Sequence, residues 1–546
     1  MKTARQHLTA IAIYALMCIP FLIGISFEYR TQMIAGFGED PLQWMWFLAW
    51  WPHAILHGLN PLHPNCVFAP HGESIAWATS TPLQCLLVAP ITLTLGLAPA
   101  YNTIATTAII LNGWAAYWLC RCANAKHTPA VIAGAIFTYS PYFIAEMLGR
   151  PNNYCFYPIP IYYALTALLI QQRISQTKYA IAAGTTLAAL FYTSPELAAE
   201  TAMMTSIAAI IWWMTSQTDR NKIQTALPAA ITAGLLAITA ASPFIYAMLT
   251  TPHPAQIFPP LLTAADAANF IIPTPITWLG GNRWEYIQMM WHSYIAEQDD
   301  YLGIPLILLL YSYWKSNRNN PRARTLTYCT AASAILAMGP VMQICGYCTN
   351  IPLPGLLIYV TPMLHEMFPT RLAAFTMLGA TTTLAVWLTT SNTNTWKKAA
   401  ATSIIAITLW PNFPNGWWNV TQQDPKFFKR QTYKQYIQPN SNVLILPAGA
   451  EAHDCYWQAQ SHFYWNMPRG WLGAAVPGNH YSTHIASYQF PQWLRKHNVQ
   501  TVLVQTRYAD RYRALTKQLG LPLNYTGGIT IYTTPKGKTH EQQTIH

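Results

Sequence analysis

Charge is what this chain of 546 residues has least of. Asp, Glu, Lys and Arg make up 9% of the sequence, whereas an average soluble protein has about 25%. Hydrophobic residues make up 52%, and the chain carries 22 Trp and 31 Tyr, residue types that are enriched where a membrane meets water. This composition excludes a string of ordinary soluble domains and indicates an integral membrane protein.

Several catalytic signatures are missing as well. The sequence contains no Gly-rich phosphate loop, no His-Glu-x-x-His zinc motif and no Gly-x-Ser-x-Gly nucleophile elbow. Its ten cysteines are scattered, and no further pair of ligands at zinc spacing accompanies Cys345 and Cys348. For these two, ordinary thiols and a local disulfide are the two interpretations. The sequence therefore gives no support to zinc-dependent or nucleotide-dependent chemistry.

Long apolar runs are abundant, and they alternate with short polar breaks from Ala10 to about Pro411. A membrane helix needs about 20 mostly apolar residues. We expect a polytopic α-helical membrane domain over residues 1–411, with about eleven spans. The candidate spans are residues 8–27, 102–119, 128–145, 155–171, 179–194, 200–216, 225–247, 301–314, 325–344, 372–390 and 398–411.

Every second break is basic, and the breaks between them hold nearly all the acids of this region. Lys and Arg near the ends of spans are retained in the cytoplasm, so we expect a cytoplasmic N-terminus and, after eleven spans, a C-terminal segment outside. The same rule explains the net charge of +12 better than nucleic-acid binding does. The basic breaks contain Lys2, Arg5, Arg121, Lys126, Arg173, Lys178, Arg220, Lys222, Lys315, Arg318, Arg322, Arg324, Lys397 and Lys398.

The apolar segment 81–98 is expected to be a juxtamembrane hairpin, broken at Pro90 and closed by Gly96. If it crossed the membrane, Arg121 and Lys126 would lie outside, against the charge pattern.

Three outer loops are long, at residues 28–101, 248–300 and 345–371. The first contains the Trp-rich stretch 42–57, which we expect to lie as a helix in the membrane interface. From residue 412 to 535, short strand-like runs alternate with helical patterns, which predicts a small extracytoplasmic α/β domain. The strand-like runs are 442–446, 500–505 and 528–533, and the helical patterns are 490–497 and 508–519. Residues 536–546 are expected to form a disordered tail.

Glu39 and Asp40 are the first candidates for chemistry, because they lie roughly twelve residues beyond the first span. A carboxylate at the membrane surface can take a proton from a hydroxyl as a general base. Alternatively, Asp40 caps the helix that follows it.

Further acids occur at the outer ends of other spans. Glu146, Glu196, Asp299 and Asp300, with the adjoining Tyr301, are expected to line an outer cavity or to bind an acceptor. Helix capping explains the same positions equally well. A divalent cation is a third interpretation for the Asp299 cluster, although we expect no dedicated metal site.

Outer arginines are scarce in the membrane half, where Arg30, Arg150, Arg283 and Arg371 stand alone. An arginine at the outer interface can hold a phosphate with a bidentate fork. Arg371, Arg283 and the weaker candidate His53 are therefore expected to contact a donor phosphate. The alternatives are snorkelling to lipid headgroups for the arginines and packing for His53.

The layout resembles the GT-C class of integral membrane glycosyltransferases. The matching parts begin with a first span, an acidic outer loop (Glu39-Asp40), interfacial helices and an apolar hairpin with Pro82-Leu83. They continue with Asp299-Asp300-Tyr301-Leu302-Gly303 and with Pro352-Leu353-Pro354 through Pro369-Thr370-Arg371, which resemble a poorly characterised bacterial branch. So does the soluble end from Val443-Leu444-Ile445-Leu446-Pro447 to the closing strand.

The resemblance implies a multi-pass protein of the bacterial inner membrane that takes a sugar from a polyprenyl-phosphate donor. The acceptor would be a periplasmic glycan, lipid or protein, and the transfer would invert the sugar. Asp40 or Glu39 would be the base and Arg371 a phosphate partner. The order Glu-Asp is the reverse of that common in mannosyltransferases. The rival hypothesis is a non-catalytic transporter or polysaccharide-assembly protein.

Overall fold

The structure is a computed structural model in which most of the chain can be described. The described residues are 2–19, 32–33, 36, 40–217, 219–252, 258–293, 295–361, 364–412, 420–421, 425–448, 453–473, 476 and 489–534.

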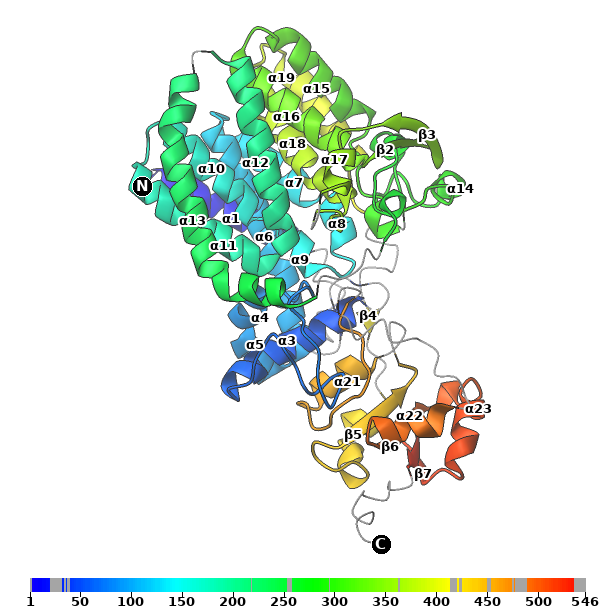
Figure 1. The fold of residues 1–546 in the computed structure, drawn as a ribbon. Helices are drawn as coiled ribbons and strands as arrows, with labels where there is room; N and C mark the ends of the chain where they lie inside the picture. Colours follow the sequence, from blue (N-terminus) through cyan, green and yellow to red (C-terminus); the bar gives the residue numbers. More distant parts are fainter. Residues whose placement is uncertain are drawn as a thin grey trace.

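A bundle of helices forms the larger part of the molecule (Figure 1). Within the described residues, four helical stretches are long and apolar enough to cross a membrane. They are α6 (Leu97–Cys122), α12 (Pro195–Thr215), α13 (Arg220–Thr250) and the stretch Pro369–Thr390, which contains α18 (Ala373–Thr390). Each of the eleven expected spans overlaps a helix, but most of these helices are too short or too polar to meet the same criteria. The structure therefore supports a membrane protein without confirming eleven spans.

The remaining helices of the bundle are shorter. They are α1 (Lys2–Met17), α7 (His127–Thr138), α8 (Pro141–Glu146), α9 (Pro151–Tyr154), α10 (Pro158–Ile170), α11 (Gln176–Thr193), α15 (Ile304–Asn317), α16 (Pro321–Ala337) and α19 (Thr395–Thr408).

The expected span 325–344 is wrong at its outer end. Helix α16 stops at Ala337, because Gly339 adopts a φ of 72° and Pro340 has no amide hydrogen to continue the helix. The chain then forms an antiparallel hairpin of β2 (Val341–Ile344) and β3 (Tyr347–Pro352). Cys345 lies in its turn and Cys348 in β3, and both are free thiols.

Segment 81–98 forms two short helices, α4 (Pro82–Leu87) and α5 (Ala89–Leu95), and neither is long enough to cross a membrane. The break falls at Val88 instead of Pro90, because proline is tolerated in the first turn of α5. Gly96 ends the pair with a φ of 99°.

The Trp-rich stretch forms helix α3 (Asp40–Leu56), which is more buried than an interfacial helix would be. Its side chains Trp44, Trp46 and Trp50 are at most 6% exposed. Helix α3 lies beside α4 and α5, between the bundle and the C-terminal part (Figure 1). There the indole of Trp46 donates to Oε1 of Gln458 in α21 (Asp454–Gln460), at 2.9 Å.

The C-terminal part is built around a four-stranded sheet in the order β5-β6-β8-β7. Strands β5 (Asn442–Leu446) and β6 (Val499–Gln505) are parallel, while β8 (Ile529–Thr533) and β7 (Asn524–Thr526) add antiparallel pairs. Buried side chains of β5 and β6 pack against α22 (Phe490–Lys496). Three of these strands and α22 fall where the sequence predicts them, whereas β7 and α21 were not predicted. The expected helix over 508–519 is reduced to α23 (Arg513–Thr516) and a 3-10 turn.

Short elements complete the described chain. They are α14 (Glu285–Gln288), α17 (Leu356–Tyr359), α20 (Lys426–Lys429) and the pair of β1 (Gln32–Met33) with β4 (Val420–Thr421).

Candidate active site

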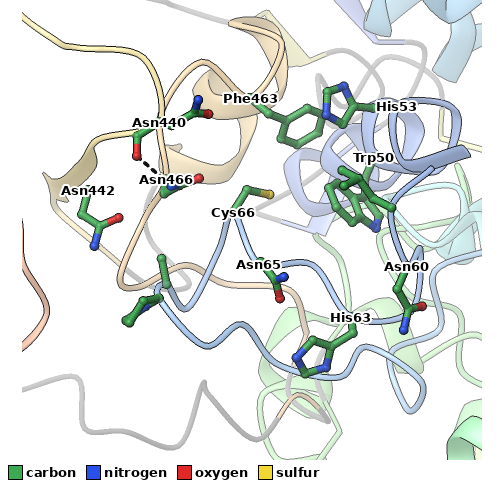
Figure 2. A pocket seen from close by; sticks show the side chains of 13 residues that line it. Trp50, His53, Asn60, His63, Asn65, Cys66, Asn440, Asn442, Phe463 and Asn466 are labelled. Carbon is green, nitrogen blue, oxygen red and sulfur yellow. Dashed lines mark hydrogen bonds between the residues drawn. The ribbon is translucent and has the colours of Figure 1, made fainter. Parts of the chain in front are cut away.

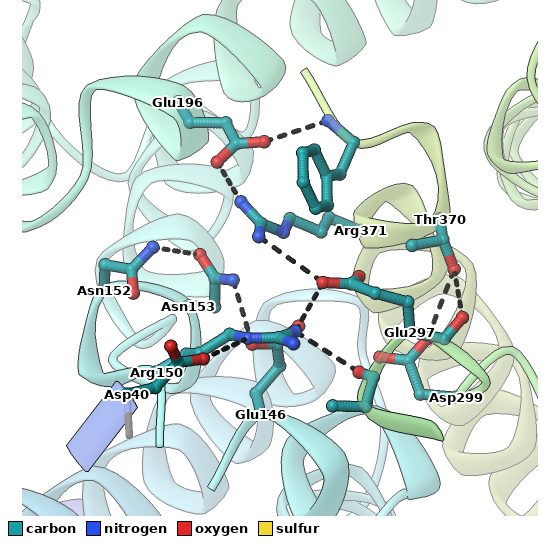
Figure 3. A network of polar contacts seen from close by, with 12 residues as sticks. Asp40, Glu146, Arg150, Asn152, Asn153, Glu196, Glu297, Asp299, Thr370 and Arg371 are labelled. Carbon is teal, nitrogen blue, oxygen red and sulfur yellow. Dashed lines mark hydrogen bonds and ion pairs between the residues drawn. The ribbon is translucent and has the colours of Figure 1, made fainter. Parts of the chain in front are cut away.

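Glu297 is the centre of a network of charged side chains (Figure 3). It closes the 3-10 turn Ile295–Glu297, and its side chain is fully buried. One carboxylate oxygen, Oε1, receives hydrogen bonds from two arginines, Arg150 at 2.5 Å and Arg371 at 3.5 Å. A single glutamate thereby joins two segments that are far apart in the sequence.

Arg150 extends the network toward helices α8 and α3. It follows the turn between α8 and α9, and its guanidinium lies 3.4 Å from Oε1 of Glu146 at the end of α8. The other oxygen of Glu146 accepts from the Asn153 amide at 2.9 Å. The Nε atom of Arg150 lies 3.8 Å from Oδ2 of Asp40, the first residue of α3.

Arg371 extends the network in the other direction. It lies in the 3-10 turn Pro369–Leu372 that leads into α18, and it pairs with Glu196 in the first turn of α12. The second oxygen of Glu196 accepts from the Phe368 amide at 3.1 Å. The guanidinium also lies over the ring of Phe368, 4.2 Å from its centre, a favourable cation–π arrangement. These contacts hold the Arg371 side chain in one orientation.

Asp299 and Asp300 lie beside the network, and both are buried. The hydroxyl of Thr370 donates to Oδ2 of Asp300 at 2.8 Å and lies 3.3 Å from Oδ1 of Asp299. Burial raises the pKa of both carboxyl groups well above the ordinary aspartate value. Tyr301 is buried next to them, with its hydroxyl against Gly303.

Acids outnumber arginines in the network, and this has a consequence for protonation. Burial raises the pKa of Glu146 to about 7, and the nearby Glu297 adds to the rise, while Arg150 and Arg371 oppose it. Glu146 can therefore exchange a proton near neutral pH. Across the described part of the chain, no three His, Cys, Asp or Glu side chains come together in a way that could hold a metal ion.

Asp40 differs from the other acids of the network in its exposure. Its side chain is 54% exposed, whereas the side chains of Glu146, Glu196 and Glu297 are 0–16% exposed. A carboxylate that is reachable from outside and anchored on one side by Arg150 is the group best placed to meet an incoming hydroxyl. Glu39 lies outside the described residues.

The structure brings most of the predicted site residues together but leaves two apart. Arg283 is exposed, and its guanidinium donates to the carbonyl of Leu279 at 3.0 Å. His53 lies 13 residues after Asp40 along α3, which places it about 20 Å away at the rise of an α-helix. Neither contacts the network around Glu297.

Sequence reasoning missed the central roles of Glu297 and Arg150. Glu297 stands two residues before Asp299, and Arg150 is among the scarce outer arginines, so both carried a signal. What the sequence lacks is their pairing, because they are 147 positions apart. Asn153, which orients Glu146, carried no signal.

No protein-family model and no curated protein sequence matches the chain. Several solved structures are similar to it. Arabinofuranosyltransferase AftD from mycobacteria matches 96% of this chain with a TM-score of 0.59 at 13% identity, and this chain spans 40% of the length of AftD. The Archaeoglobus fulgidus oligosaccharyltransferase matches 93% of this chain, over 69% of its own length, with a TM-score of 0.53 at 12% identity.

ArnT from Cupriavidus metallidurans is similar over the full length of both proteins. The match covers 98% of this chain and 99% of ArnT, with a TM-score of 0.50 at 8% identity. At such low identities the similarities establish a fold and nothing finer. The chain has the fold of the GT-C glycosyltransferases.

Proposed function

We propose that this protein is a glycosyltransferase that moves a sugar from a polyprenyl-phosphate donor to a glycan, lipid or protein acceptor outside the cytoplasm. The observation that carries the proposal is the exposed carboxylate of Asp40, which lies 3.8 Å from Arg150 at the edge of a buried charged network. The similar solved structures include an arabinofuranosyltransferase and an oligosaccharyltransferase. Their fold supports the same class of reaction here.

Asp40 is the general base of the proposed reaction. The acceptor oxygen attacks the anomeric carbon of the sugar and forms the new glycosidic bond, while Asp40 takes the hydroxyl proton. The bond between the anomeric carbon and the phosphate oxygen breaks, and the polyprenyl phosphate leaves with the bonding electrons. Attack from the side opposite the phosphate inverts the sugar. General base catalysis of this kind contributes roughly 10²–10⁴ in rate.

Arg371 is the proposed partner of the leaving phosphate. A guanidinium carries five N–H donors in a planar fork, so it can bind phosphate oxygens while it keeps a carboxylate. Glu196 and Glu297 hold this fork in place, which spares the cost of ordering it during the reaction. Arg150, on the other side of Glu297, can supply a second positive charge.

The proposed location is the bacterial inner membrane, with the network on the periplasmic side. Glu196 lies in the first turn of α12 and Asp299 and Asp300 precede α15, whereas Arg121 ends α6 and Lys397 follows the far end of α18. Acids therefore gather at one end of the bundle and bases at the other. Retention of basic residues in the cytoplasm supports an extracytoplasmic network, a cytoplasmic N-terminus and a periplasmic sheet domain.

The proposal is tested with the purified full chain in nanodiscs. The protein is incubated with a panel of polyprenyl-phosphate sugars and a periplasmic acceptor extract, and released polyprenyl phosphate and glycosylated acceptor are followed by mass spectrometry. We expect release and transfer from at least one donor. If proteoliposomes instead move an intact lipid-linked sugar across the bilayer and no donor is cleaved, the protein is a transporter and the proposal is wrong.

A further inference from the structure

A cavity of about 410 Å³ lies away from the charged network, at the junction of the first outer loop and the C-terminal part. One wall comes from the end of α3 and the chain that follows it, and the other from the start of β5 and the chain after α21 (Figure 2). Five asparagines from both walls line the cavity: Asn60, Asn65, Asn440, Asn442 and Asn466.

The two walls are fixed to each other by the main chain. The Met467 amide donates to the Cys66 carbonyl at 2.8 Å, and the Ala69 amide donates to the Met467 carbonyl at 2.9 Å. The side chain of Gln458 donates to the same Cys66 carbonyl at 2.7 Å. The cavity is therefore a feature of the packed structure, and a ligand would not have to order its walls first.

Aromatic rings form one side of the cavity. Phe463 and Trp50 meet edge to face with ring centres 5.5 Å apart, and His53 lies 4.6 Å from Phe463. Such rings offer flat apolar faces to the C–H surface of a ligand. The remaining lining residues include no Asp, Glu, Lys or Arg.

Two histidines line the cavity. His63 has its Nε2 atom 3.2 Å from the His71 carbonyl oxygen, and His53 is uncharged at neutral pH. Burial, together with the nearby His57 and His462, lowers the pKa of His53 to about 4. The cavity consequently presents no formal positive charge through His53, which favours a neutral ligand over a phosphate.

Two of the amides have hydrogen-bonding capacity to spare. The side chains of Asn65 and Asn440 are exposed, and neither has a hydrogen-bond partner within the described part of the chain. The Asn466 amide donates to the Asn440 carbonyl at 2.9 Å, which leaves its side-chain oxygen to accept. Each asparagine amide offers both donors and an acceptor, the complement of a row of sugar hydroxyls.

We propose that this cavity is a binding subsite for a neutral oligosaccharide. Aromatic faces contact the sugar ring, and the amides of Asn65, Asn440 and Asn466 bind its hydroxyls. Since His53 is about 20 Å from Asp40 along α3, the subsite holds sugar units remote from the reacting hydroxyl. Naming this glycan as the acceptor rests on the proposed function, whereas the binding itself does not.

The test is binding of the full chain in nanodiscs to an array of neutral oligosaccharides, acidic oligosaccharides and peptides. The key variant is the double substitution Asn65→Ala with Asn440→Gly. Glycine is chosen at position 440 because Asn440 has a φ of 57°, which would strain alanine. The matched control is Gln435→Ala, which removes an exposed amide outside the cavity.

We expect at least one neutral oligosaccharide to bind, and we expect the double variant to weaken that binding about tenfold or more, since two hydrogen-bonding groups are lost. Gln435→Ala should bind like the wild type, and both variants should have the melting midpoint of the wild type. Binding to acidic glycans or peptides alone, no binding to neutral glycans, or binding that the double variant leaves intact would overturn the proposal.

The same array separates this proposal from the proposed function. Asp40→Asn should keep its glycan binding, because Asp40 does not line the cavity. Loss of transfer activity with retained binding leaves the subsite standing, and retained transfer without binding to the array removes the subsite alone.

Discussion

At the scale of single residues, the site depends on how two arginines are shared among several acids. A buried charge pair adds little net stability to the fold, because the cost of desolvation offsets most of the attraction. Removing one partner is destabilising, because the other charge then stays buried without compensation. One carboxylate oxygen of Glu297, Oε1, contacts both Arg150 and Arg371, so Glu297 serves chiefly to position the two guanidinium groups. That role fits a site that must present positive charge in a fixed orientation.

The protonation of Glu146 should make stability depend on pH. Its pKa rises from an ordinary value of 4.5 to about 7 in the folded protein. Between these values the folded state binds more protons than the unfolded state, so stability falls as pH rises and levels off above pH 7. The difference corresponds to about 3 kcal/mol at 1.36 kcal/mol for each pKa unit.

Glu146→Gln removes this titrating group. We expect the melting midpoint of the wild type in detergent to fall more between pH 5 and pH 8 than that of the variant. The raised pKa values of Asp299 and Asp300 act in the same direction in both proteins, so the variant should retain part of the slope. Equal slopes for the two proteins would mean that Glu146 is not protonated at pH 5.

Much of the site at this scale could be predicted from sequence, because charges are so scarce that each one draws attention. Asp40, Glu196 and Arg371 were found in this way. The pairings could not be predicted, since Arg371 and Glu196 are 175 positions apart and only the packing of α12 against the turn before α18 brings them together.

At the scale of helices, close approach through glycine determines how the first helices pack. Gly113 of α6 and Gly134 of α7 face the ring of Tyr14 in α1, and a Cβ on Gly134 would overlap both the Tyr14 hydroxyl and the Gly113 carbonyl. The Tyr14 hydroxyl also donates to the Val131 carbonyl at 3.0 Å. These contacts leave no room for a larger residue.

Gly134→Ala should therefore lower the melting midpoint, with an overpacking cost of about 1–3 kcal/mol. Gly234 is the matched control, because it also lies inside a helix, α13, but a Cβ there meets nothing within 4 Å. Gly234→Ala should leave the midpoint unchanged or raise it, since alanine is the better helix former by up to about 1 kcal/mol. Similar losses from both substitutions would refute the packing argument.

Apolar length and charge alternation predicted where the helices lie, because these patterns follow directly from the cost of burying charge in a membrane. These patterns mispredicted the end of a helix where a glycine with positive φ and a proline stop it within an apolar run. The run through Val341 remains apolar, yet Gly339 and Pro340 end α16 and the chain turns into a hairpin. The burial of α3 was also hidden, since it depends on contacts with α21 more than 400 positions away.

At the scale of the whole molecule, α3, α4, α5 and the sheet domain lie toward one end of the bundle (Figure 1). The network reaches α3 through Asp40, and the asparagine-lined cavity lies between the end of α3 and the C-terminal part. This arrangement is what a transfer reaction outside the cytoplasm requires, because donor, acceptor and base must share one side of the membrane. The GT-C fold could be inferred from sequence, whereas the number of spans and the extent of the domains stay predictions.

The orientation can be tested with a native thiol. Cys348, in the hairpin beyond α16, is the exposed one among the ten cysteines. In cells whose outer membrane has been permeabilised, a membrane-impermeant maleimide should label the wild type and not Cys348→Ser. Labelling only after the inner membrane is opened would place this hairpin, and the network with it, in the cytoplasm.

The most direct test of the central claim is the rate of sugar transfer by Asp40→Asn, measured with the purified chain and its cognate donor and acceptor. Asp510→Asn is the control, since Asp510 pairs with Arg513 on the exposed surface. We predict that Asp40→Asn lowers kcat by roughly 10²–10⁴ with little change in KM, and that the control retains full activity. Transfer by Asp40→Asn at the wild-type rate would contradict the assignment of Asp40 as the base.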